Sequence, residues 1–327
     1  MDDSDGLLIY VRDLPAGAYD DRRSHARAAE GGTEARVAHG VYADAAQWGS
    51  LDRRARYIAR VEAIARTRLR RPVVSHWSAA ALHGLPVVAQ KLEAVHITAP
   101  KASGGRSYPG VTMHCVLLGD EEVVEVNGLL VTSLARTLID IAASAAAISS
   151  VPALDHALHL SRKGEQPPLL TKAELWDAYS RRMPFVGHAR ARTAIEFAVT
   201  TSDSPLESVS RVNMWEIGFP VPELQHRFDD HRGLIGFSEF YWPEYRLVGE
   251  ADGQSKYTDP KYRRGRSLER VLLDEKERAD RIGALGETVS RWGWSTAINP
   301  RALRAHLLTA GLPLPSKQLA RKLGTDA

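Results

Sequence analysis

Cysteine is almost absent from this chain of 327 residues, because Cys115 is the only one. A single thiol excludes a disulfide within the chain and a zinc site built from several thiolates. A large excess of charge of one sign is also missing, since the net charge is only +3, and no strongly basic tail points to nucleic acid. The lack of disulfides fits a reducing cytoplasm, which is where we expect the protein to reside.

Long apolar runs are missing as well. The small-residue stretch 139–154 contains Asp140 and Pro152, and it is too short and too polar to span a bilayer. The first residues read Met-Asp-Asp-Ser-Asp-Gly, which is acidic where a secretory signal needs basic charge. The hydrophobic content of 44% and the charged content of 25% are ordinary for globular proteins, and the length allows two or three domains. We therefore expect a soluble chain with no membrane partner.

Positive charge is concentrated in two segments. Residues 51–75 contain eight arginines against only Asp52 and Glu62. A second segment, 261–266, contains Lys261, Arg263, Arg264 and Arg266 with no acid. Such clusters are compatible with contacts to nucleic-acid phosphates, and equally with a solvated helix face and a solvated loop.

The N-terminal 50 residues predict a reduced winged-helix-like segment. Asp20–Glu30 reads as a helix that ends at Gly31-Gly32, and Glu34–Tyr42 reads as a short β-wing. A helix followed by a wing is the second half of a winged helix, in which one helix faces DNA. The residues on that helix that would contact DNA are Arg22, Arg23 and Arg27.

Residues 51–199 predict a small sheet with helices around and after it. Leu51–Leu69 has apolar residues at helical spacing, and Asn127-Gly128 between two apolar runs is a strong hairpin signal. Ser133 is expected to cap a helix that runs to about Ala147. His76, His83, His96 and His114 fall on different elements without a helical or hairpin pair, so they are interpreted as separate packing or surface histidines.

Residues 200–327 predict a third domain with the order helix, strand, strand, helix, strand. Ser204, Pro205 and Glu207 form a strong helix start, with a cap, a proline at the first position and an acid at the third. An apolar hairpin comes next. Ser267–Leu285 reads as an amphipathic helix with Leu268, Val271, Leu272, Ile282 and Leu285 inward, and 287–298 reads as the last strand.

Three carboxylates lie in this apolar hairpin: Glu239, Glu250 and Asp252. Alternate residues of a strand share a face, so Glu250 and Asp252 point the same way. Glu239 joins them if Tyr241 pairs with Val248, which leaves 243–246 as the connection. Like charges on one face repel, and a divalent cation is the usual compensation. The alternative is an acidic sheet end that is solvated and holds no metal.

This pattern resembles the PD-(D/E)XK restriction-endonuclease-like superfamily, in the branch near very-short-patch-repair endonucleases and the bacterial DUF559 proteins. The residues that carry the likeness are Ser238-Glu239-Phe240, Leu247-Val-Gly-Glu250-Ala-Asp252-Gly253 and Ser204-Pro-Leu-Glu207-Ser, and it covers about residues 200–298. The resemblance implies hydrolysis of DNA phosphodiesters with Mg²⁺ or Mn²⁺ held by Glu239, Glu250 and Asp252. These three acids and Lys256 would be the catalytic residues.

Two positions depart from the superfamily pattern. Glu239 stands where an aspartate is usual, and Asp252 stands where a lysine is usual, so Lys256 would have to supply that positive charge. Glu207 would be an outer-shell contact, although a capping acid is the more ordinary role at its position. Lys261, Arg263, Arg264 and Arg266 would hold the DNA backbone without reading its sequence.

The middle of the chain resembles AbiEi-type antitoxins, through Ser75-His-Trp-Ser-Ala-Ala-Ala-Leu-His-Gly-Leu-Pro86 and Val131-Thr-Ser-Leu-Ala-Arg-Thr-Leu-Ile-Asp140. The likeness implies a cytoplasmic DNA-binding repressor, with a cognate toxin as a possible partner.

Taken together, the sequence predicts an α/β (α+β) chain with a small sheet and helices in the middle and an αββαβ nuclease-like domain at the C-terminus. Two functions stay open: a metal-dependent DNA endonuclease or nickase, and an antitoxin-like repressor whose nuclease-like domain binds DNA without cutting it.

Overall fold

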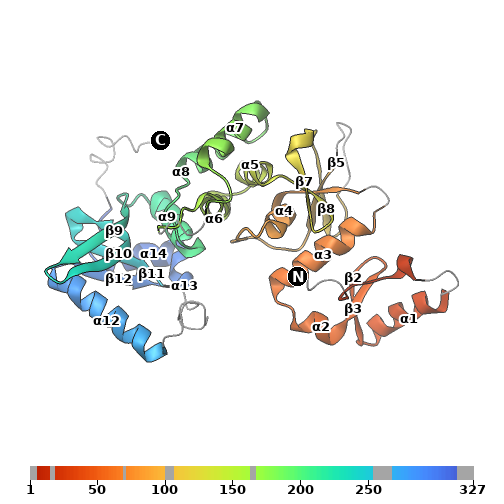
Figure 1. Ribbon diagram of the computed structural model, residues 1–327, viewed down its shortest axis with the longest axis horizontal. Coiled ribbons are helices and arrows are strands. Elements are labelled where there is room, and N and C mark those ends of the chain that lie inside the picture. Colours follow the sequence, from red (N-terminus) through yellow and green to blue (C-terminus); the bar gives the residue numbers. More distant parts are fainter. Residues whose placement is uncertain are drawn as a thin grey trace. The chain divides into compact units, whose positions relative to one another are not determined.

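The computed structural model describes residues 6–14, 19–68, 71–99, 107–162, 167–252 and 267–314. It confirms a mixed α/β chain, with helices around three separate sheets (Figure 1). The chain forms two compact units, of which the first contains 1–145 and 172–193 and the second contains 146–171 and 194–327. The predicted borders at 50 and 200 differ from this division, because residues 146–171 belong with the C-terminal part. No helix within the described ranges is both long enough and apolar enough to cross a bilayer.

The first unit begins with the predicted helix and wing. Helix α1 (Tyr19–Glu30) is followed by the antiparallel hairpin β2 (Glu34–Ala38) and β3 (Val41–Asp44), and β1 (Ile9–Tyr10) completes a sheet with the order β1-β3-β2. Two short helical elements flank these strands: η1 (Val11–Asp13) and α2 (Ala45–Ser50). The small core of this sheet includes Ala63 of helix α3 (Arg53–Arg66), so the three strands pack onto α3 and do not stand alone.

A five-stranded sheet with the order β6-β5-β4-β8-β7 forms the rest of the first unit. Asn127 and Gly128 both have positive φ, of 50° and 73°, which is the geometry of the predicted tight hairpin turn between β7 and β8. The Ser133 side chain accepts a hydrogen bond from the Arg136 amide and caps α5, as expected. The elements after α3 are β4 (Val73–Val74), α4 (His76–Leu82), β5 (Val95–Ala99), β6 (Val111–Cys115), η2 (Asp120–Glu122), β7 (Val123–Val126), β8 (Leu129–Thr132), α5 (Leu134–Ser144), α7 (Lys172–Arg182) and α8 (His188–Phe197), the last of which runs into the second unit.

The second unit is built on a four-stranded sheet with the order β12-β11-β10-β9, in which only β11 and β12 are parallel. Strand β9 is absent from the elements predicted from the sequence, and the last strand is shorter than predicted because it ends at Trp292. The elements are α6 (Ala147–Leu158), α9 (Pro205–Ile217), β9 (Glu223–Asp230), β10 (Gly233–Trp242), η3 (Pro243–Tyr245), β11 (Leu247–Ala251), α12 (Leu268–Ala284), β12 (Thr288–Trp292), α13 (Trp294–Ala297) and α14 (Pro300–Thr309).

The two faces of this sheet are covered by different helices. On one face, Tyr241 and Val248 pack against Ile282 of α12. On the other face the Trp292 indole donates to Ser210 of α9, at 2.9 Å. Gly249 lies under Trp292 and Trp242, where a Cβ would come within 2.7 Å of the Trp292 ring. Ile282 is buried as predicted, but Leu285 is 36% exposed and does not join the core.

Helix α6 is anchored to α9 by a buried ion pair. Asp155 accepts hydrogen bonds from the Arg211 guanidinium at 2.8 Å, the Ser208 hydroxyl at 2.7 Å and the Val199 amide at 2.8 Å. Burial raises the pKa of Asp155, and the neighbouring Arg211 works against that rise. The pair therefore holds α9, the helix that carries Glu207, against residues that lie some 50 positions earlier in the sequence.

Replacing this buried acid is expected to destabilise the second unit. Asp155→Asn should lower the free energy of unfolding by about 3 kcal/mol, because Arg211 stays buried without its counter-charge. Urea denaturation measures the change. The matched control is Asp203→Asn, whose ion pair with Arg162 is much more exposed and whose loss should cost at most about 1 kcal/mol. Equal losses in the two variants would contradict the anchoring role.

Candidate functional site

The predicted acids lie at neighbouring positions of the C-terminal sheet. Tyr241 pairs with Val248 and Phe240 with Gly249, as the predicted register requires, and residues 243–246 form the connection. The Ala251 amide donates a hydrogen bond to the Glu239 carboxylate, which brings β10 and the end of β11 together at that point. Glu239, Glu250 and Asp252 are thus gathered near one edge of the strands, and they lie among arginines.

Arg278 of α12 neutralises Glu250. It donates to one Glu250 oxygen at 3.0 Å, and its other terminal nitrogen lies 2.7 Å from the second oxygen. The second contact is a charge attraction without the angle of a hydrogen bond, so that oxygen has no hydrogen-bond donor in the described part of the chain. Arg278 also donates to the Phe237 carbonyl at 2.7 Å. Burial is the largest influence and lowers the pKa of Arg278, but Glu250 and Glu239 together outweigh it and raise the pKa.

A second arginine links Glu250 to Asp252. Arg291 lies opposite Glu250 in the parallel ladder of β11 and β12. Its Nε is 3.6 Å from a Glu250 oxygen and 3.7 Å from an Asp252 oxygen. Arg291 thus shares its charge between the two acids, and this reduces the repulsion that was expected from the sequence.

Glu207 is a capping acid and also an electrostatic neighbour of Glu239. The Ser204 hydroxyl donates to one of its oxygens at 2.8 Å and accepts from the Glu207 amide at 3.2 Å, which caps the start of α9. The second oxygen accepts from the Asp203 amide at 3.1 Å and from the Gln225 side chain at 3.3 Å. Burial, and after it the charge of Glu239, raise the pKa of Glu207 to about 8. The carboxylates of Glu207 and Glu239 therefore repel each other near the start of α9.

These acids do not make a ready metal site. In the portions of the chain that the structure describes, no group of three or more His, Cys, Asp or Glu side chains is placed to hold a metal ion. Arg278 faces both oxygens of Glu250, and one oxygen of Glu239 already accepts from a backbone amide. The donors are hard oxygens, which suit Mg²⁺ or Mn²⁺ chemically, but guanidinium groups supply the positive charge here. Coordination by Glu239, Glu250 and Asp252 stays a prediction that requires Arg278 to move away.

The basic residues predicted to contact DNA fall partly outside the described residues. Lys256, Lys261, Arg263, Arg264 and Arg266 belong to 253–266, which lies outside them, and so does the side chain of Arg22. Arg23 and Arg27 lie on α1 and are exposed, one helical turn apart.

Three of the middle histidines lie on different elements and serve as packing residues, as expected, but the fold also brings their rings together. The rings of His76 from α4 and His114 from β6 stack with centroids 3.5 Å apart, and His96 of β5 is 5.3 Å from His114. His96 Nδ1 and His114 Nε2 share a hydrogen bond at 3.0 Å. The cluster forms because β5 and β6 pair in parallel, which places His114 beside Thr98 on the neighbouring strand. Parallel pairing has no local turn signature, so the sequence alone does not reveal it.

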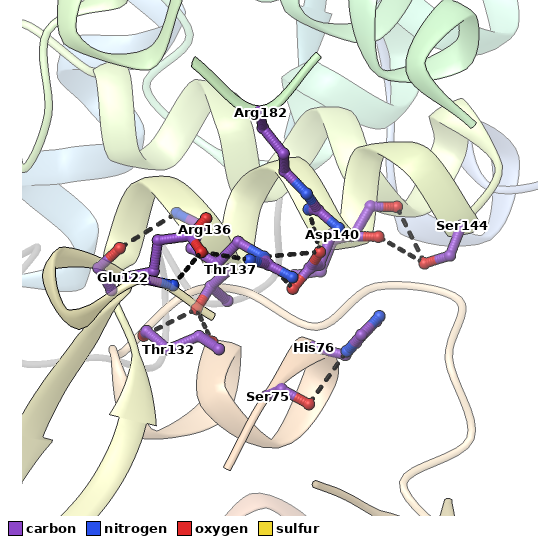
Figure 2. A network of polar contacts seen from close by, with 12 residues as sticks. Ser75, His76, Glu122, Thr132, Arg136, Thr137, Asp140, Ser144 and Arg182 are labelled. Carbon is purple, nitrogen blue, oxygen red and sulfur yellow. Dashed lines mark hydrogen bonds and ion pairs between the residues drawn. The ribbon is translucent and has the colours of Figure 1, made fainter. Parts of the chain in front are cut away.

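A buried ionic network lies beside these histidines and explains the motif 131–140 (Figure 2). Arg136 and Asp140 are each 3% exposed and pair at 3.0 Å, and Arg136 also reaches Glu122 at 2.7 Å. Figure 2 shows Arg182 extending to the same Asp140 carboxylate, and a Ser144 hydroxyl donates to the Asp140 carbonyl at 2.7 Å. The motif thus has a structural role, since it joins α5 to α7 and to η2.

Comparison with known proteins adds a distant likeness. No family model matches the chain. Two curated proteins of Mycobacterium tuberculosis are similar to it: "Uncharacterized protein MT2308" of strain CDC 1551 / Oshkosh and "Uncharacterized protein Rv2248" of strain ATCC 25618 / H37Rv. Each is 27% identical over 212 residues, which cover 65% of this chain and 70% of the relative. Neither name states an activity, so the likeness transfers none to this chain.

The buried histidines predict a loss of stability in acid. Burial is the main cause that lowers the pKa of His76 to about 2 and that of His96 to about 4, against 6.5 for an exposed histidine; the charges of Arg136 and Arg182 add to the effect on His76. Below pH 6.5 the unfolded chain therefore binds protons that the folded chain does not, so the free energy of unfolding should fall from pH 6.5 towards 4.

Urea denaturation across this range of pH measures the effect. His76→Asn should flatten the pH dependence, and asparagine suits the positive φ of 50° at this position. His231→Asn, at an exposed turn, is the matched control and should leave the slope unchanged. A slope that His76→Asn does not alter would contradict a buried neutral histidine.

Proposed function

We propose that this chain is a DNA-binding protein in which the α1 and β2–β3 segment contacts the duplex. The observation that carries the proposal is the orientation of α1. His25 bonds Glu34 of the hairpin at 2.8 Å and stacks on Tyr42 at 5.7 Å, which fixes one side of the helix on the wing. Arg23 and Arg27 are four residues apart, and both are exposed. Their position on a helix that is followed by a wing is what contact with phosphates requires.

In this proposal the C-terminal domain binds DNA without hydrolysing it. Arg278 pairs with both oxygens of Glu250, and Arg291 lies near Glu250 and Asp252, so protein groups neutralise these two acids. This favours the antitoxin-like alternative, a transcriptional repressor, for which a toxin protein is the partner that the middle-region resemblance implies.

A second function, metal-dependent DNA cleavage, is favoured by one specific observation. The pairing of Tyr241 with Val248 places Glu239 at the same end of the strands as Glu250, and burial together with the charge of Glu239 raises the pKa of Glu207 nearby to about 8. If Arg278 swings away, Glu239, Glu250 and Asp252 are the residues that would hold Mg²⁺ or Mn²⁺. The metal would polarise a phosphate oxygen and activate water.

The double variant Arg23→Gln/Arg27→Gln tests DNA binding. Two phosphate contacts are lost, so binding to duplex DNA of any sequence should weaken. The slope of log K against log salt should become shallower by about 1.8, which is about 0.9 for each contact. Fluorescence anisotropy over a salt series measures both. The control is Arg227→Gln. Arg227 is an exposed arginine of the second unit, where it pairs with Asp229, and its loss should leave the slope unchanged. An unaltered slope in the double variant would exclude α1 from the interface.

Plasmid nicking separates the two functions. With Mg²⁺ or Mn²⁺ and supercoiled plasmid, the parent protein is expected to leave the plasmid intact, because the ion pair with Arg278 keeps Glu250 from binding a metal. Glu250→Ala and the matched hairpin control Glu244→Ala should behave like the parent. Nicking by the parent and by Glu244→Ala, together with loss of nicking in Glu250→Ala, would establish the second function instead.

A further inference from the structure

A cavity of about 390 Å³ lies in the first unit, and its walls include neither α1 nor the acids of the C-terminal sheet. The walls come from the end of β2, the C-terminal half of α3 and the start of β6. This volume is within the range of about 300–1,000 Å³ that is usual for small-molecule sites. The cavity belongs to no function described so far.

Arg68 places an uncompensated cation at this cavity. Its Nε is buried and has no hydrogen-bond acceptor in the described ranges, and its guanidinium lies 4.8 Å from the centre of the Tyr108 ring. Burial lowers the pKa of Arg68, and no acid among the described residues offsets it. A guanidinium that is partly removed from water without a counter-charge pays part of the desolvation penalty, and an anion bound there would relieve it.

The other walls define what kind of anion would fit. Arg60 contributes a second guanidinium, and Val37, Ile64 and Val111 contribute apolar surface. Among the described residues that line the cavity, Glu93 is the one acid, and it is exposed. Guanidinium groups bind phosphate with paired donors, and the stacked layer of Arg68 and Tyr108 offers a flat surface for a ring.

We propose that this cavity is a nucleotide site, in which Arg68 and Arg60 bind the phosphate and the apolar wall beside Tyr108 holds the base. The nucleotide is either a free nucleoside phosphate or one unit of a single-stranded nucleic acid, since both present the same phosphate and ring. The site is independent of α1, so duplex binding through Arg23 and Arg27 can fail while this site stands.

Calorimetric titration of the full chain with adenosine 5′-monophosphate, adenosine, inorganic phosphate and a short oligo-dA tests the site. Adenosine monophosphate or the oligonucleotide should bind, and adenosine and phosphate alone should bind at least about tenfold more weakly, because each lacks half of the contacts. Binding of the monophosphate identifies a free nucleotide as ligand, and binding of the oligonucleotide alone identifies a strand.

Three variants make the test specific. Arg68→Gln should weaken binding about tenfold or more, and Arg68→Lys should weaken it too, because lysine lacks the planar pair of donors. Arg53→Gln removes a charge from the other end of α3, outside the cavity, and should bind like the parent. Urea denaturation shows whether each variant is folded, and Arg68→Gln should be no less stable because it removes an uncompensated cation. No binding of either nucleotide probe by the parent, or equal binding by parent and Arg68→Gln, would overturn the proposal.

Discussion

The ion pair between Glu250 and Arg278 decides what the C-terminal sheet can do. A carboxylate in a central strand must be compensated, and the compensating group comes from α12 on the covering layer. Because Arg278 also binds the Phe237 carbonyl, the same side chain fixes the helix along β10. This single side chain thus positions α12 on the sheet, neutralises Glu250 and limits the ability of Glu250 to bind a metal.

Buried ionisable groups are handled in two ways in this chain, by pairing with an opposite charge or by staying neutral. In the second unit it is paired, as with Asp155 and Arg211, or Glu250 and Arg278. In the first unit Arg136 and Asp140 are paired, but the three stacked histidines beside them are held neutral by burial. Arg68 follows neither pattern, because it is partly buried, charged and without an acid in the described ranges. That exception is the reason for proposing a ligand site at Arg68.

Local features were largely predictable and tertiary ones were not. The Asn127-Gly128 turn, the Ser133 and Ser204 caps and the pairing of Tyr241 with Val248 follow from short-range rules, and the structure confirms them. Strand β9 is hard to predict because its sequence, Glu-Leu-Gln-His-Arg-Phe-Asp-Asp, is polar and resembles a loop. In the sequence, Arg278 looks like one of the outward charges of an amphipathic helix. Only the packing of α12 on the sheet shows that it faces Glu250, and this long-range contact has no signature in spacing.

The division of the chain into two units determines which fragments can be expressed separately. The backbone passes from one unit to the other after 145, 171 and 193, so α6 is contributed to the C-terminal unit from within the sequence of the N-terminal one. A fragment of 200–327 would leave Asp155 behind and expose the side of α9 where Arg211 and Ser208 bind it. The C-terminal part is therefore not a module that a single cut can release. A fragment or exchange that is meant to keep this unit intact has to carry α6 along with 194–327.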